Sequence, residues 1–180
     1  MEIDDTIIKK LLGFKPKNIE IYKNAFVHKS IAKELNTDSY ERLEFVGDSV
    51  IGLIVASYLY EKYPNENEGY LTRIRTKIVS SKGLSNFAQL LELDKYVKMN
   101  SKAINQEWNK NARILEDTFE ALMGALYLDK GLEPCRKFFI RIIEKYMNTS
   151  ELETDTNYKD ILMKFVQSRQ LKCPEYKITH

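Results

Sequence analysis

The stretch from Glu41 to Tyr60, ERLEFVGDSVIGLIVASYLY, constrains the fold of this chain more than any other. From Leu43 onward it contains only two charged residues, Glu44 and Asp48. Together with Glu41 these acids follow the spacing i, i+3 and i+7, which places three carboxylates on one face of a helix. A carboxylate in so apolar a segment is costly to bury unless a partner compensates its charge. Taken alone, this pattern fits either a functional site built from these carboxylates or the solvated side of a surface helix.

A second segment of the same kind spans residues 111–131, NARILEDTFEALMGALYLDKG. Between Thr118 and Leu128 its only charge is Glu120, and Asp117 lies three residues earlier on the same helix face. Two helices this apolar are expected to pack together in the core. If their acidic faces meet, like charges converge and cannot all ionise without a cation. Because oxygen ligands favour Mg2+ or Mn2+ over zinc, the sequence predicts a magnesium site.

The two segments resemble the acidic motifs of the ribonuclease III family, which are endonucleases that cut double-stranded RNA. The resemblance rests on ERLEFVGDSV and ILEDTFEALMGALYLDKG and covers roughly residues 19–147. It implies an all-α fold, a compact multi-helix endonuclease domain, which we expect to occupy residues 1–148.

The resemblance also implies the reaction, metal-assisted hydrolysis of phosphodiester bonds. The products would carry 5′-phosphate and 3′-hydroxyl ends with short 3′ overhangs. A Mg2+ ion, with Mn2+ as a substitute, lowers the pKa of a bound water and neutralises charge on the phosphate; one or two ions are both compatible with four acids. The implied metal ligands are Glu44, Asp48, Asp117 and Glu120, and Glu41 and Glu68 are implied as further catalytic acids near the cleavage site.

A homodimer is implied as well, because a duplex has two strands and one site cuts one. Phe45 matches a family position whose ring inserts into the partner. The alternative is an ordinary core residue, and both interpretations predict a buried side chain. The substrate would be double-stranded RNA, recognised through A-form shape, phosphates and 2′-hydroxyls.

Residues 70–81, YLTRIRTKIVSS, predict an amphipathic helix with basic residues on it. Arg73, Arg75 and Lys77 either form a solvated face or contact RNA phosphates, and the sequence does not separate these interpretations.

Composition limits the class of protein. The chain has 180 residues, of which 43% are hydrophobic, so it can bury a core, and its net charge is only +2. Its 2 cysteines are too few for a disulfide framework and favour a reducing compartment. The N-terminus lacks a signal-peptide pattern, and the uncharged run 49–60 is too short to span a bilayer. We expect a soluble, intracellular protein with no membrane association, in the cytoplasm or the nucleus.

Other segments predict further elements. A helix over residues 3–13 should end at Gly13, and a second should run from Asn18 to about Ser30. His28, in this second helix, is interpreted as structural rather than catalytic. Asn36, Thr37 and Asp38 could cap the long acidic helix, polar residues 98–110 predict a loop, and residues 135–147 a final helix.

The C-terminal part has a different character. Residues 149–156 are polar and acidic and predict a linker. Residues 157–180 resemble the first helix and first strand of a double-stranded RNA-binding domain. The sequence ends at His180, before the rest of such a domain, which predicts either a trimmed sequence or a C-terminus with another purpose.

Two other classes remain as alternatives. A binding module that has lost catalysis on the same fold should have a damaged acidic quartet, whereas all four acids are present. A helical adaptor with its acids on the surface should neither bind metal nor cut RNA.

Overall fold

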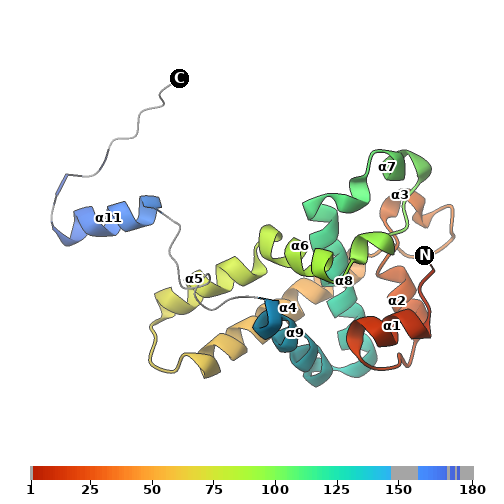
Figure 1. The fold of residues 1–180 in the computed structure, drawn as a ribbon, viewed down its shortest axis with the longest axis horizontal. Helices are drawn as coiled ribbons and strands as arrows, with labels where there is room; N and C mark the ends of the chain where they lie inside the picture. The colour runs from red at the N-terminus through yellow and green to blue at the C-terminus, as the bar shows by residue number, and fades with distance from the viewer. Residues whose placement is uncertain (1, 147–157, 170, 173, 175–180) are drawn as a thin grey trace. The chain divides into compact units, whose positions relative to one another are not determined.

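The computed structural model describes residues 2–146, 158–169, 171, 172 and 174. The chain divides into two compact units, Met1–Tyr146 and Met147–His180. In the part that is described, the first unit is built from helices (Figure 1), and its sheet-like pairing is one parallel bridge between Val27 and Lys98. Its elements are α1 (Asp5–Leu12), α2 (Ile19–Asn24), α3 (Lys29–Ala32), α4 (Glu41–Lys62), α5 (Glu68–Val79), α6 (Ser81–Leu90), η1 (Leu93–Lys95), α7 (Ser101–Asn105), η2 (Trp108–Lys110), α8 (Ala112–Lys130) and α9 (Leu132–Tyr146). This confirms the all-α prediction.

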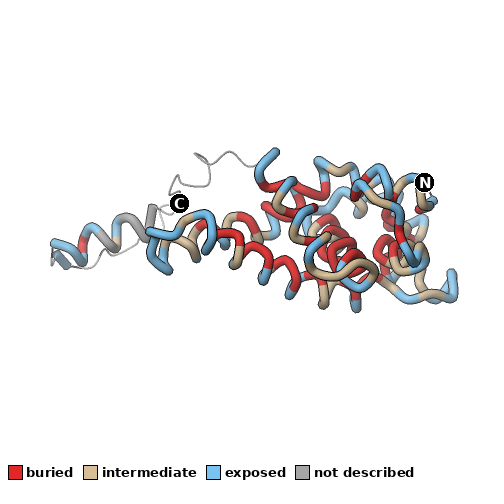
Figure 2. Tube along the Cα trace, turned by 90° about the horizontal axis from the view of Figure 1, so that it is seen from below, coloured by how far each residue is buried: buried red, intermediate tan, exposed pale blue. Residues whose placement is uncertain are grey.

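Helices α4 and α8, the two predicted from the acidic motifs, cross at the centre of this unit (Figure 1). Their backbones touch at two glycines. A methyl group built on Gly47 would lie 1.8 Å from the carbonyl oxygen of Glu120, and one built on Gly124 would lie 2.1 Å from that of Leu43. Every residue of α8 from 118 to 126 is buried, and the buried stretches, drawn red in Figure 2, lie mainly inside the helical unit. The predicted packing of the two apolar helices is therefore confirmed.

Three phenylalanines fix the neighbouring helices around α8. Phe87 of α6, Phe119 of α8 and Phe139 of α9 are all buried, and their ring centroids lie 5.5 to 5.8 Å apart. Aromatic pairs in this range contribute about 0.5–1.5 kcal/mol each beyond the area that they bury. The cluster therefore holds α6 and α9 against the helix that carries Asp117 and Glu120.

The second predicted helix is shorter than expected. α2 is capped by Asn18 as predicted but ends at Asn24, because the following residues pair with a distant segment. The backbone N–H of His28 donates to Lys98 O at 3.0 Å, and that of Lys98 donates to Phe26 O at 2.8 Å. A helix extending to Ser30 could not form these bonds.

Two other local predictions are also corrected. The N-cap residue of α4 is Tyr40 rather than a residue of 36–38, and Thr37 Oγ1 instead donates to Asn24 Oδ1 at 2.8 Å. The segment 98–110, predicted as a loop, contains α7 and η2, because the Asn100 side chain accepts from Ala103 N and starts a helix there. By contrast, the predicted stop at Gly13 is confirmed by its left-handed φ of 91°.

Helix α4 is long and apolar enough to cross a membrane by length and composition alone. Its 22 residues exceed the uncharged run of 49–60 because charged residues at its two ends are also helical. Its packing against α8 is the arrangement of a core helix in a folded domain.

The second unit contains one helix among its described residues. Its helix α11 (Tyr158–Ser168) lies where a helix was predicted, and Val166 on it is buried. The predicted linker 149–156 and the residues after Pro174 in the predicted strand lie outside the described part of the chain.

Candidate metal centre

Three carboxylates converge where α4 crosses α8. One oxygen from each of Glu44, Asp117 and Glu120 lies within 4.8 Å of the others. Glu44 is in the first turn of α4, and the other two are one turn apart on α8. The close contact of Gly47 with the Glu120 carbonyl brings the two helices near enough for these side chains to meet. The structure thus unites acids that lie far apart in the sequence.

Burial and mutual repulsion make these three acids hard to ionise without a cation. Glu120 is only 8% exposed. Its pKa is raised to about 8, first by burial and then by the charges of Asp48, Glu116, Glu44 and Asp117. Burial likewise raises the pKa of Glu44 and of Asp117. A bound cation would reverse this cost, because it favours the charged form of all three carboxylates.

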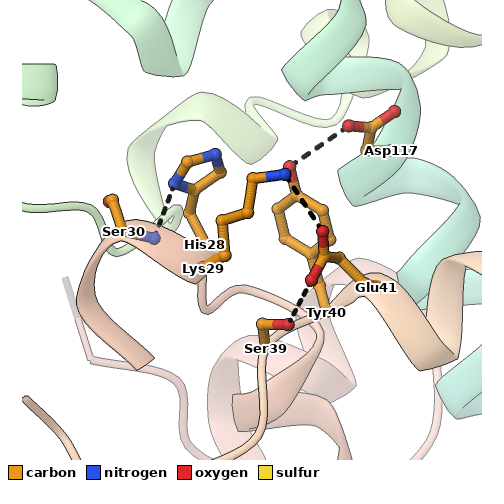
Figure 3. Close-up of polar contacts among 7 residues, drawn as sticks. All are labelled: His28, Lys29, Ser30, Ser39, Tyr40, Glu41 and Asp117. Carbon is orange, nitrogen blue, oxygen red and sulfur yellow. Dashed lines mark hydrogen bonds and ion pairs between the residues drawn. The ribbon is translucent and has the colours of Figure 1, made fainter. Parts of the chain in front are cut away.

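The other predicted acids of α4 lie outside this trio. Asp48 is exposed, yet its charge is the largest electrostatic contribution to the raised pKa of Glu120. Glu41 is held by two neighbours: Lys29 Nζ lies 3.1 Å from its Oε1, and Ser39 Oγ donates to its Oε2 at 3.1 Å (Figure 3). The hydrogen bond from Lys29 keeps the pKa of Glu41 below its ordinary value.

A hydrogen bond that the sequence did not indicate reaches the trio from Tyr40. Its hydroxyl donates to Asp117 Oδ2 at 3.2 Å (Figure 3). Tyr40 is 3% exposed, and burial together with the Asp117 charge raises its pKa far above the ordinary value. His28 packs its ring edge-to-face on Tyr40, with centroids 5.7 Å apart, and its Nδ1 accepts from Ser30 N at 3.1 Å. These contacts support the structural interpretation of His28.

The remaining predicted residues lie on α5. Glu68 is exposed in its first turn and accepts from Thr72 Oγ1 at 2.7 Å. Among the described residues, Glu68 is not one of the acids whose oxygens group with those of the trio. Arg73 lies with its guanidinium 5.2 Å from the Tyr70 ring, whereas Arg75 is exposed.

Phe45 is not a core residue of this chain. Its side chain is 78% exposed, although it sits between buried positions of α4. Leu53 and Tyr60 of the same helix are 56% and 75% exposed. The spacing of 45, 53 and 60 places them on one side of α4, so that the central helix presents an apolar stripe to the outside.

Comparison with known proteins agrees with this architecture. The model of the Ribonuclease-III-like family matches residues 18–147. The chain belongs to the ribonuclease III family. A protein of Paramecium bursaria Chlorella virus 1 is 46% identical over 169 residues, which make up 94% of this chain and 61% of that protein. Ribonuclease 3 of Zunongwangia profunda is 42% identical over 168 residues, 91% of this chain and 68% of that enzyme. The chain thus spans 61% and 68% of these two relatives.

A solved structure shares the fold of this ribonuclease III chain. It is the nuclease domain of ribonuclease III from Campylobacter jejuni, described for structural flexibility in a region involved in dimer formation. It is 31% identical, has a TM-score of 0.75, and covers 80% of this chain and 99% of that one.

The donor set of this ribonuclease III site fits a hard divalent cation. Its grouped donors are carboxylate oxygens, which suit Mg2+ or Mn2+ better than a softer metal. Within the described residues, Cys135 is buried and hydrogen-bonded to main-chain oxygens, and His28 serves as a cap, so neither adds a soft ligand to the trio. Glu44, Asp117 and Glu120 are the side chains that would hold the ion.

Proposed function

We propose that this chain is a Mg2+-dependent endoribonuclease that hydrolyses phosphodiester bonds in double-stranded RNA. The observation that carries the proposal is the trio of Glu44, Asp117 and Glu120, whose oxygens lie within 4.8 Å of one another in a family of ribonucleases. A buried, mutually repelling set of acids destabilises the fold when no cation is bound. The same set can bind a cation beside a phosphate.

The residues of the site have different proposed roles in hydrolysis. When bound, a divalent ion supplies an activated water and neutralises charge on the phosphodiester. Glu44, Asp117 and Glu120 hold and orient it, and Glu120 must release its proton for this purpose. Asp48 is proposed to complete the ligand set, and Glu41 and Glu68 to act near the cleavage site. The expected products carry 5′-phosphate and 3′-hydroxyl ends.

We also propose that two copies pair through α4. A side chain as large as Phe45 at 78% exposure, with Leu53 and Tyr60 on the same side, forms an apolar surface that a second copy would cover. The related Campylobacter jejuni domain has a region involved in dimer formation. A pair of sites would cut both strands and leave short 3′ overhangs.

RNA contact is proposed for α5 and for the second unit. Arg73 and Arg75 are two positions apart and therefore lie on different sides of the helix. Arg75 is exposed and free of the Tyr70 ring, so it is the better placed for phosphates, while Arg73 and Lys77 are half-buried.

Residues 157–180 are proposed to begin a double-stranded RNA-binding domain. We propose an intracellular enzyme.

The test is cleavage of long duplex RNA by the purified chain, with and without Mg2+. Glu120→Gln removes the charge of the most buried acid of the trio, and Glu133→Gln is its matched control, an exposed acid in the first turn of α9. We expect Mg2+-dependent cutting by wild type and by the control, and its loss in Glu120→Gln. Binding without cutting by wild type would support a non-catalytic binding module, and neither binding nor cutting would support an adaptor.

A further inference from the structure

Tyr40 contacts two of the three acids through different groups. Its hydroxyl donates to Asp117 Oδ2 at 3.2 Å, although the two residues are 77 positions apart. Its carbonyl oxygen accepts the backbone N–H of Glu44 at 2.9 Å. One residue therefore connects the start of α4 with the side chain of a ligand on α8.

Tyr40 is itself held firmly. Its backbone N–H donates to Val27 O at 2.9 Å, and its ring packs edge-to-face on His28. His28 is fixed in turn by Ser30 N and by the bond from its own N–H to Lys98 O. A donor anchored on several sides gives its acceptor a defined orientation. A carboxylate has two oxygens, so a hydrogen bond to Oδ2 leaves Oδ1 able to bind an ion.

A second tyrosine offers a natural comparison. Tyr22 is 0% exposed, and its hydroxyl donates to Asp129 Oδ2 at 3.0 Å. Asp129 also accepts the backbone N–H groups of Lys17 and Asn18, so this carboxylate anchors the start of α2. The Tyr22 bond is chemically the same as the Tyr40 bond but ends on an acid outside the trio.

We propose that Tyr40 is a positioning residue that orients the Asp117 carboxylate for the divalent cation. The proposal rests on the function proposed above, since it requires the trio to bind an ion. Hydrogen-bond donors behind a metal-ligating carboxylate fix its direction, and their removal lowers metal affinity by about 10- to 100-fold. Tyr40 supplies such a donor from a buried position on a separate segment of the chain.

The experiment measures Mn2+ binding to the full chain without RNA, by calorimetric titration and by the electron paramagnetic resonance signal of free Mn2+, at one fixed pH. The variants are Tyr40→Phe and Tyr22→Phe, each of which removes only a hydroxyl. We expect the dissociation constant of Tyr40→Phe to rise about 10-fold or more. Tyr22→Phe should bind Mn2+ as wild type does, although it also loses a buried hydrogen bond. Circular dichroism verifies that each variant is folded.

A double-mutant cycle assigns the effect to Asp117. In an Asp117→Ala background, Tyr40→Phe should weaken Mn2+ binding no further, because its acceptor is gone. Equal affinities of Tyr40→Phe and wild type would overturn the inference while leaving the proposed function intact. A similar loss in Tyr22→Phe would also overturn it, since general destabilisation would then explain the change. A wild-type chain that binds no Mn2+ would overturn both.

Discussion

Replacing Glu120 with glutamine should stabilise the metal-free protein while it removes activity. The pKa of Glu120 is raised to about 8, so the fold favours its protonated form. The stability that protonated Glu120 contributes is fully present below its pKa in the unfolded chain. It is lost as the pH rises through its pKa in the folded chain. Between about pH 4.5 and 8, ionisation of Glu120 therefore opposes folding, and a glutamine of the same shape cannot ionise.

The size of the effect follows from the shift. Relative to the ordinary value of 4.5, a pKa of about 8 corresponds to a full penalty of about 5 kcal/mol. Because protonation depends on pH, the loss of folding stability from Glu120 should be about 1 kcal/mol at pH 5, about 3 kcal/mol at pH 7 and about 5 kcal/mol at pH 9. Since Glu120 is 8% exposed, solvent screens little of this penalty.

The assay is urea unfolding in EDTA at pH 5, 7 and 9, for wild type, Glu120→Gln and the exposed control Glu133→Gln. The stability advantage of Glu120→Gln should grow with pH, while the control stays within about 0.5 kcal/mol of wild type. Excess Mg2+ should restore much of the wild-type stability, because an ion that binds only the folded state stabilises it. An advantage that is absent at pH 9 in EDTA would refute the reasoning.

Three further outcomes are expected. Gly47→Ala should lower the free energy of unfolding by about 3 kcal/mol, because its methyl group would lie 1.8 Å from the Glu120 carbonyl oxygen. A variant that unfolds at the same urea concentration as wild type would contradict the close contact of α4 with α8. Asp129→Ala should also cost about 2 kcal/mol, because the Tyr22 hydroxyl and the backbone N–H groups of Lys17 and Asn18 lose their acceptor, and a loss of Mn2+ affinity per folded molecule would show that it does more than anchor α2. Phe45→Ala should weaken self-association at least about 10-fold in sedimentation experiments, and an unchanged dimer would remove Phe45 from the interface.

The sequence was sufficient for the two central helices and for the position of the acids on them. A long apolar run with acids at helical spacing is typical of a core helix, and the resemblance to a family indicated which acids would come together. The sequence did not show that Glu41 pairs with Lys29 while Asp117 pairs with Tyr40. Such choices depend on which side chains lie nearby after folding.

Long-range contacts also explain the errors in local structure. The helix predicted to reach Ser30 stops at Asn24 because the chain pairs with Lys98, and no local pattern reports a partner so far away. Phe45 was expected to be buried either in the core or against a second copy, and its exposure rules out the core while the second copy stays a prediction. The sequence of α4 alone does not define which face of the helix is left uncovered by the other helices, and Phe45 lies on that uncovered face.

The glycine crossing has a consequence for how the centre tolerates change. The separation of α4 and α8 is set where main chain meets main chain, with no side chain between the two helices at that point. Substitutions elsewhere in the interior can therefore alter the melting point while the spacing of the carboxylates stays the same. The main chain therefore sets the spacing of the candidate metal ligands, and the surrounding hydrophobic residues can change without altering that spacing.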